Sequence, residues 1–389
     1  MTPSLEGKAQ ANLKAYIKLF TAAGISYLRF TRVIPIVLSV DLGTKNSLVC
    51  KKCYIFKGML LRLFVSKPVG NTAMENKQIV ITQFGEPDVL AVQSSPVPQP
   101  KPGEVLVKVA FSGVNPIDVK TRAGLGWAAE KNKEKLPWVP GYDVSGQIVE
   151  VTEGCRKLKV GDNVVGLVGF PLRAGGYSQY ISLAESELNL VPDSVTLEAA
   201  AVLPLAGQTA VQALDKAKVV EGDRVLILAG AGGVGHLAVQ IAVAAKAEVY
   251  TTCSEANLDY MATLGAHAIN YNFASVSERV EGVDVLIDLV GGDTALDALK
   301  CLNDNARVVS VPTNSAKLIC EKASILGFTA AGMLVEPNPE QLDTMLYMVG
   351  VGLLKTEIQK VFPMTDVVKA HQQVETGHTR GKVLLDMTC

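Results

Sequence analysis

A glycine-rich segment is the first part of the chain whose composition points to chemistry. Residues 230–235 read Gly-Ala-Gly-Gly-Val-Gly, after an apolar segment at 225–228 and before an Ala-rich segment at 234–245. Glycines let the backbone turn tightly and approach a phosphate, and the first amides of a following helix have no partners within it. A glycine turn without a ligand has the same composition, but the expected strand, turn, helix and second strand favour a dinucleotide. The predicted pyrophosphate contacts are Gly230, Gly232, Gly233 and Val234.

The end of the next expected strand, 248–253, indicates which dinucleotide binds. NAD enzymes usually place Asp or Glu there, where the carboxylate holds the ribose hydroxyls and repels a 2′-phosphate. This chain has Thr252 and Ser254 at that place. Small hydroxyl side chains favour NADPH. NADH stays an alternative, because Glu255 is adjacent and residues 256–260 contain no Arg or Lys.

The elements around this turn follow an alternating order. Expected strands at 225–228, 248–253, 268–271, 283–289 and 307–311 alternate with helices that include 234–245 and 294–302. Apolar strands alternating with helices are typical of a doubly wound parallel sheet. We therefore predict an α/β fold, with a Rossmann dinucleotide-binding domain over residues 198–332.

Shorter strands precede this region. Segments 79–82, 105–111, 145–151, 163–167 and 177–181 alternate in hydrophobicity between glycines and prolines, which predicts a β-barrel domain over 74–197. The proline-rich segment 96–102 is typical of an edge or turn. Residues 333–389 contain further helices and an expected strand at 382–386 that could rejoin this first domain.

Overall composition excludes several classes of protein. The chain is 48% hydrophobic and 19% charged with a net charge of −1, which favours a globular enzyme and gives no indication of nucleic-acid binding. Residues 1–73, however, hold eleven Lys and Arg and only two acidic residues. This basic extension is interpreted as a mis-started leader before Met74 or as a targeting or membrane-surface segment. Its apolar run at 34–40 is too short to span a bilayer, so no integral membrane span is expected.

The cysteines indicate a reducing compartment. Seven cysteines are scattered along the chain without the spacing of a disulfide framework, which favours a cytoplasmic location. Cys50 and Cys53 have a zinc-like spacing, but no second pair or histidine follows nearby. We predict no metal there.

Six motifs in order carry a family resemblance. They are Asn-Pro-Ile-Asp at 115–118, Pro-Gly-Tyr-Asp-Val-Ser-Gly at 140–146, Gly-Asp at 161–162, Leu-Pro-Leu-Ala-Gly-Gln-Thr-Ala at 203–210, the glycine turn, and Thr-Arg-Gly-Lys at 379–382. Together they resemble the quinone oxidoreductase group of the medium-chain dehydrogenase/reductase superfamily, over about residues 76–389. The resemblance implies a GroES-like β-barrel domain wrapped around a Rossmann domain.

The resemblance also implies a metal-free site. The alcohol dehydrogenase branch of this superfamily binds a catalytic zinc through Cys and His, near the positions that Asn115 and Tyr142 occupy here. Neither Asn nor Tyr is a usual zinc ligand. Without a metal to polarise an alcohol, reduction of an already polarised acceptor becomes the reasonable chemistry.

We therefore predict NADPH-dependent hydride transfer to a quinone or to the β-carbon of an enone. The enolate-like anion that forms needs only hydrogen-bond donors. By resemblance, Asn115 lies near the nicotinamide and substrate, Thr209 and Lys382 contact the nicotinamide side, and Tyr271 contacts the adenine or ribose. Tyr142 is the candidate proton donor, with solvent as the alternative source and a buried packing role as the alternative for the ring.

Two other functions stay open from the sequence. One is a trans-2-enoyl thioester reductase, and the other is a non-catalytic NADPH-binding protein, since function depends on the site and not on the fold. The expected partner is a small carbonyl or quinone substrate. A homodimer formed through the last strands of two cofactor sheets is common among similar proteins and is expected here.

Overall fold

The computed structural model describes residues 75–389. Contacts divide the chain into two units, Met1–Ala73 and Met74–Cys389, and the second holds all the described residues. The predictions for the basic extension, and for Cys50 and Cys53 within it, concern residues outside the described part.

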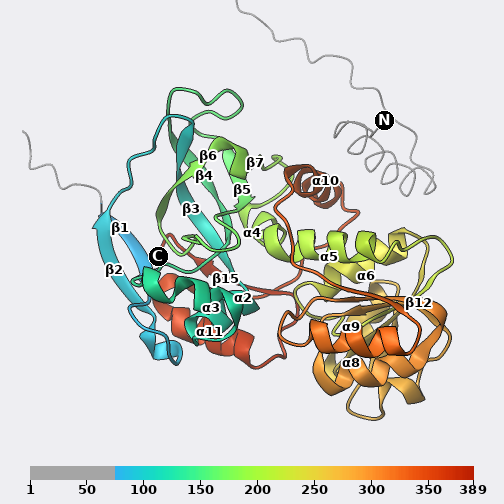
Figure 1. Cartoon of the computed structure of the whole chain (residues 1–389). Helices are drawn as coiled ribbons and strands as arrows, with labels where there is room; N and C mark the ends of the chain where they lie inside the picture. Colours follow the sequence, from blue (N-terminus) through green and yellow to red (C-terminus); the bar gives the residue numbers. More distant parts are fainter. Residues whose placement is uncertain (1–74) are drawn as a thin grey trace, which may run out of the picture. The chain divides into compact units, whose positions relative to one another are not determined.

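A mostly antiparallel sheet forms the first domain and also takes in the end of the chain (Figure 1). Its strands run in the order β14 (Ile358–Pro363), β15 (Lys382–Asp386), β3 (Glu104–Val114), β4 (Asp143–Val151), β5 (Asn163–Leu167) and β7 (Asn189–Leu190). A further strand, β6 (Tyr180–Ala184), pairs with β3, and β1 (Glu75–Val80) pairs with β2 (Ala91–Pro96) in a separate ribbon. Because β3 has apolar residues on both faces, it lies in the middle of the core, with β4, β6 and β15 as partners.

The second domain is built on a parallel sheet of six strands among the described residues. Its order is β10 (His267–Asn270), β9 (Glu248–Cys253), β8 (Arg224–Ile227), β11 (Val283–Asp288), β12 (Leu302–Ser310) and β13 (Thr329–Gly332). All neighbouring pairs are parallel. The chain reverses its direction of winding between β8 and β11, and a doubly wound sheet binds its ligands outside the carboxyl ends of the strands at such a point.

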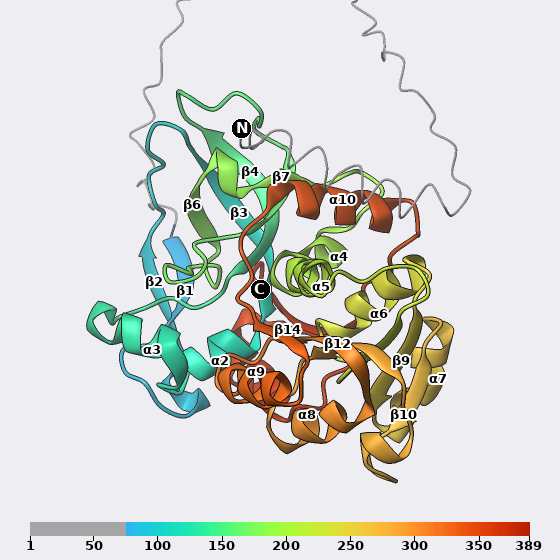
Figure 2. The same ribbon diagram turned by 45° about the vertical axis from the view of Figure 1, so that its right-hand side comes forward.

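Ten α-helices cover these sheets within residues 75–389. They are α2 (Pro116–Arg122), α3 (Gly126–Asn132), α4 (Leu197–Ala201), α5 (Pro204–Lys216), α6 (Gly235–Ala244), α7 (Leu258–Thr263), α8 (Gly292–Ala298), α9 (Ala316–Ile325), α10 (Pro339–Gly350) and α11 (Val367–Glu375). Figure 2 shows α5 between the antiparallel domain and the parallel sheet, where it contacts β4, β5 and α6. The helix α11 packs on α2 and β15, so the chain ends inside its first domain.

The predicted α/β fold, with a Rossmann sheet and a GroES-like domain, is confirmed, and the differences are local. The strand expected at 177–181 lies at Tyr180–Ala184, as β6. Its bounds are shifted because residues 180–184 are the ones that pair with residues 108–104 of β3. The exposed strand β2 and the edge strands β13 and β14 were not predicted, since their apolar patterns are weak. The helix α8 begins earlier and ends earlier than expected, at Gly292 and Ala298.

Candidate active site

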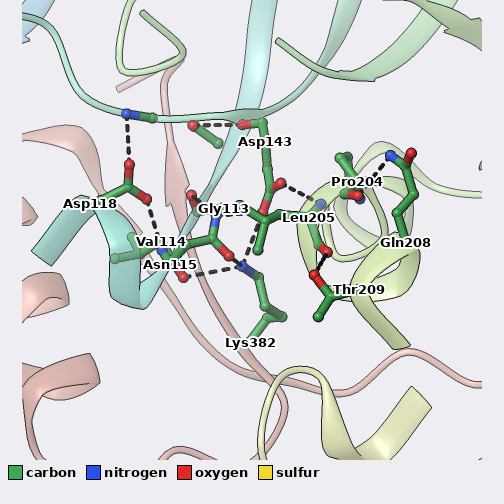
Figure 3. Close-up of polar contacts among 12 residues, drawn as sticks. Gly113, Val114, Asn115, Asp118, Asp143, Pro204, Leu205, Gln208, Thr209 and Lys382 are labelled. Atoms are coloured by element: carbon green, nitrogen blue, oxygen red, sulfur yellow. Dashed lines mark hydrogen bonds and ion pairs between the residues drawn. The ribbon is translucent and has the colours of Figure 1, made fainter. Parts of the chain in front are cut away.

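Three strand ends of the antiparallel sheet bring Asn115, Asp143 and Lys382 together (Figure 3). The strand β3 lies between β4 and β15, and its register places Gly113 opposite Asp143. Asn115 follows β3 directly as the N-cap of α2, while Asp143 and Lys382 are the first residues of their strands. A Cβ at Gly113 would lie 2.4 Å from Asp143 Oδ2, so glycine is what admits the carboxylate.

The Lys382 ammonium is buried and has three acceptors. Nζ donates to Val114 O at 3.1 Å, to Asp143 Oδ2 at 3.0 Å and to Asn115 Oδ1. Asn115 Nδ2 donates to the same Asp143 oxygen at 2.9 Å. The side chains of Lys382 and Asp143 are 4% and 0% exposed, so water does not compete for the pair. We call these residues the Asn115–Asp143–Lys382 cluster.

The cluster limits what Lys382 and Asn115 can contact. An ammonium has three donors, and all three of Lys382 are used within the protein. Its stem lies beside the glycine turn instead, because a Cβ on Gly233 would be 3.2 Å from Lys382 Cδ. The structure thus places the Lys382 methylene groups beside the glycine turn, while its charge is held within the cluster, and the nicotinamide-side contact of Lys382 stays a prediction.

Two buried aspartates connect the cluster to the surrounding backbone. Asp143 Oδ1 accepts from the Leu205 amide at 2.8 Å, in the first turn of α5. Asp118 accepts from the amides of Asn115 at 2.9 Å and Gly141 at 3.0 Å. Burial raises the pKa of Asp118 to about 7, and the nearby Asp143 charge adds to this rise. The partnership of Asp143 with Asn115 and Lys382 was not predicted from the sequence, although the Pro-Gly-Tyr-Asp motif contains the residue.

Tyr142 lies in the core behind the cluster. Its ring is buried and contacts Phe170 edge to face, and its hydroxyl donates to Pro171 O at 3.0 Å. Burial raises the pKa of the phenol above its ordinary value. The structure therefore does not support Tyr142 as the proton donor, because the hydroxyl is directed to backbone and the ring is solvent-inaccessible.

The glycine turn joins β8 to α6. Gly230 packs against Thr251, where a Cβ would lie 1.9 Å from Oγ1, and a Cβ at Gly235 would lie 2.2 Å from Ala229 O. Within the described residues, the amides of Gly233 and Val234 have no hydrogen-bond acceptor, and α6 begins at the next residue. Unpaired amides at a helix N-terminus suit a phosphate, so the turn fits a dinucleotide pyrophosphate.

His236 supports this turn, a role that was not predicted from the sequence. Nδ1 donates to Gly232 O at 2.9 Å and Nε2 accepts from the Glu357 amide at 3.2 Å, so the ring is the neutral Nδ1–H tautomer. Burial lowers the pKa of His236 to about 4, which keeps it neutral. The spacing of four residues between Gly232 and His236 is the one sequence signal that could have found the bond.

Thr252, Ser254 and Tyr271, the residues expected at the ribose end of the cofactor, differ from one another in burial and in hydrogen-bond partners. Thr252 is buried, and its Oγ1 accepts from the Ala229 amide at 2.8 Å, so it stabilises the glycine turn and does not support a direct ribose contact. Ser254 follows β9, and its hydroxyl accepts from Asn257 Nδ2 at 3.1 Å. Tyr271 is 41% exposed, and its amide donates to Cys253 O at 3.3 Å. Ser254 and Tyr271 are therefore neighbours at the carboxyl ends of β9 and β10.

A cavity of about 250 Å³ lies where the two domains meet. Thr209 of α5 and Val234 of the glycine turn both line it, together with residues that follow β11 and β12. Its other lining residues include Ile117, Leu125, Trp127, Phe170, Leu205, Leu289, Val290, Val311, Met333, Leu334 and Val335. Thr209 Oγ1 donates to Leu205 O at 2.7 Å, which leaves its lone pairs as acceptors. The cavity is thus largely apolar and opens beside the turn.

Residues 75–389 contain neither a candidate metal site nor a candidate membrane span. No three His, Cys, Asp or Glu side chains there gather in a group that could hold a metal ion. No helix in the same part of the chain has both the length and the apolar character to cross a membrane.

Comparisons with known proteins give consistent matches. Residues 101–193 match the model of the alcohol dehydrogenase GroES-like domain, and residues 264–385 match the zinc-binding dehydrogenase model. The 2-methylene-furan-3-one reductase of Solanum lycopersicum is 33% identical, covering 80% of this chain and 79% of that protein. The chloroplastic NADPH-dependent alkenal/one oxidoreductase of Arabidopsis thaliana is 32% identical with the same coverages, 80% and 79%. The solved quinone oxidoreductase from Coxiella burnetii has a TM-score of 0.78 and 39% identity, covering 80% of this chain and 99% of that one.

Proposed function

Because the chain belongs to the quinone oxidoreductase group of the medium-chain dehydrogenase/reductase family, we propose that it is an NADPH-dependent oxidoreductase of quinones or α,β-unsaturated carbonyls. The observation that carries this function is the cavity of about 250 Å³, which is lined in part by Val234, the last residue before α6. A dinucleotide whose pyrophosphate lies on the amides of the turn would present its other end to this apolar cavity.

The chain supplies binding and orientation, while the cofactor supplies the redox chemistry. When bound, NADPH would supply the hydride, and the residues of this chain would hold and orient it. We propose that the amides of Gly233 and Val234 hold the pyrophosphate, that Ser254 and Tyr271 contact the ribose and adenine, and that Thr209 accepts a hydrogen bond on the nicotinamide side. The Asn115–Asp143–Lys382 cluster keeps the start of α2 and the start of α5 in place, since Asp143 is bonded to both segments.

The cavity wall favours an apolar acceptor. Its side chains are mainly aliphatic and aromatic, and the polar ones are Lys120, Thr121, Thr209 and Thr313. The lining includes no Asp, Glu, His, Cys or Tyr. We therefore propose that solvent supplies the proton that neutralises the enolate-like or phenolate product, because no buried acid of the described chain lines the cavity.

We also propose that the reaction is independent of zinc. By the family resemblance, the zinc ligands of the alcohol dehydrogenase branch would fall near Asn115 and Tyr142, and both side chains have other partners here. The Asn115 amide is bonded to Lys382 and Asp143, and the Tyr142 hydroxyl is bonded to Pro171 O. Amide and phenol groups are poor zinc ligands, and these are already engaged.

The decisive experiment is a turnover assay with the purified full chain. Loss of NADPH absorbance is followed with a panel of small quinones, enones and trans-2-enoyl thioesters, with NADH in parallel, and each reaction is repeated with a chelator. We expect turnover of quinones or enones with NADPH, unchanged by the chelator. Tight NADPH binding without turnover of any acceptor would favour the non-catalytic protein, and turnover restricted to thioesters would favour the thioester reductase.

Two broader proposals concern assembly and location. We propose a homodimer through β13, which pairs only with β12 among the described strands and is preceded by the exposed Ile325 and Leu326. Light scattering on the wild type and on Ile325→Glu tests this, with a monomer expected for the variant.

We propose a cytoplasmic location because the five described cysteines are all unpaired. Fractionation of cells that make the full chain tests it.

A further inference from the structure

The last strand of the chain brings Arg380 to the glycine turn. The amide of Gly381 donates to Ala231 O at 2.8 Å, and the amide of Lys382 donates to Glu357 O at 2.9 Å. Arg380 directly precedes these residues, and its own amide donates to Gln359 Oε1 at 2.8 Å. A basic side chain that is remote in the sequence is therefore fixed beside the segment that fits the pyrophosphate.

Two contacts hold the Arg380 guanidinium in one orientation. Nε donates to Glu357 Oε1 at 2.7 Å, and Cζ lies 5.2 Å from the centroid of the Tyr260 ring. Glu357 is itself held by His236, which accepts from its amide. The side chain of Arg380 is 47% exposed, and within the described residues Nη1 and Nη2 have no acceptor. Two of the three guanidinium nitrogens thus keep their donors for a ligand.

The position of Tyr260 relates this guanidinium to the ribose end of the cofactor site. Tyr260 belongs to α7, the helix that follows β9 after Ser254. In a doubly wound fold the adenosine ribose lies beyond the end of the second strand, which is β9 here. The guanidinium therefore lies between the glycine turn, which Gly381 contacts, and the helix that begins at the ribose end.

We propose that Arg380 binds the 2′-phosphate of NADPH and selects NADPH over NADH, an inference that rests on the proposed function. Residues 256–260, which follow the expected ribose end of β9, contain no Lys or Arg that could bind this phosphate. Glu255 and Glu357 would repel a phosphate dianion if no cation were present. Arginine suits the task because its paired N–H groups match two phosphate oxygens, and Glu357 and Tyr260 orient those groups before the ligand arrives.

Equilibrium binding tests this assignment without relying on turnover. Dissociation constants for NADPH, NADH and adenosine 2′,5′-bisphosphate are measured by titration calorimetry for the wild type, Arg380→Gln and Arg380→Lys. The matched control is Arg156→Gln, because Arg156 is an exposed arginine in the antiparallel domain. Melting temperatures of all four proteins report on folding.

The expected result is selective. Arg380→Gln raises the dissociation constants of NADPH and the bisphosphate by about 10- to 100-fold, as loss of a charge-assisted hydrogen-bond pair should. The dissociation constant of NADH stays within about twofold of the wild-type value. Arg380→Lys recovers part of the loss, and Arg156→Gln changes nothing. Unchanged NADPH affinity in Arg380→Gln overturns the assignment, as does equal weakening of NADPH and NADH. In both cases a wild type that binds NADPH leaves the proposed function standing, whereas a wild type that binds neither dinucleotide contradicts that function itself.

Discussion

Replacing Lys382 with methionine is the sharpest test of the Asn115–Asp143–Lys382 cluster. The variant keeps a side chain of similar length but leaves the Asp143 carboxylate buried without its counter-ion. At the 3.0 Å separation of the pair, Coulomb attraction at an effective dielectric constant of about 20 is about 5–6 kcal/mol. Two hydrogen bonds to Asp143 remain in the variant, from Asn115 Nδ2 and the Leu205 amide. We therefore expect the free energy of unfolding to fall by about 3–5 kcal/mol, the usual cost of removing one partner of a buried pair.

The assay is a double-mutant cycle with Asp143→Asn. Urea unfolding is followed by the fluorescence of Trp127 and Trp138, the only tryptophans of the chain. Because the double variant carries no uncompensated charge, it should be more stable than the sum of the two single effects predicts, by about 2–3 kcal/mol.

A surface pair provides the matched control. Lys369 and Asp366 form an exposed ion pair at 3.1 Å, and the same cycle on them, with methionine and asparagine, should give a coupling of about 0–0.5 kcal/mol. If the effects at residues 143 and 382 add within about 0.5 kcal/mol, the cluster is not held by its charges, and our account of the site is refuted.

Three further predictions concern neighbouring groups. Tyr142→Phe should lower the free energy of unfolding by about 1 kcal/mol, because one hydrogen bond to Pro171 O is lost, and should leave kcat within about twofold. A large loss of kcat would restore Tyr142 as the proton donor. Gly113→Ala should destabilise the protein by about 1–3 kcal/mol, because the new Cβ would lie 2.4 Å from Asp143 Oδ2, and thermal unfolding measures this. Burial raises the pKa of Asp118 from 3.8 to about 7 in the fold. The stabilisation that its protonated form contributes is therefore complete below pH 3.8 and is lost as the pH rises through 7. Urea unfolding from pH 5 to 8 should therefore show stability falling by up to about 1.4 kcal/mol per pH unit, with a flatter profile for Asp118→Asn.

Local patterns were sufficient to predict much of the fold. The bounds of β5, β9 and β15 agree with the expected strands at 163–167, 248–253 and 382–386. The glycine turn lies between a strand and a helix as predicted, since a run of glycines between apolar segments has few other stable conformations. The weakly apolar edge strands were missed, because their pairing depends on neighbours that are distant in the sequence.

The same difference between local patterns and long-range pairing applies to the candidate site. Residue types alone predicted a nucleotide-binding turn, hydroxyl side chains after β9, and, by resemblance, Asn115 and Tyr142 in place of the zinc ligands of the alcohol dehydrogenase branch. The tertiary structure decided the partners of those side chains. Lys382 pairs with Asp143 across 239 residues, and Arg380 lies on Tyr260 through the return of the last strand to the first domain. Backbone conformation depends mainly on residues a few positions away, whereas the partner of a buried charge is determined by strand order and register, which no short segment contains.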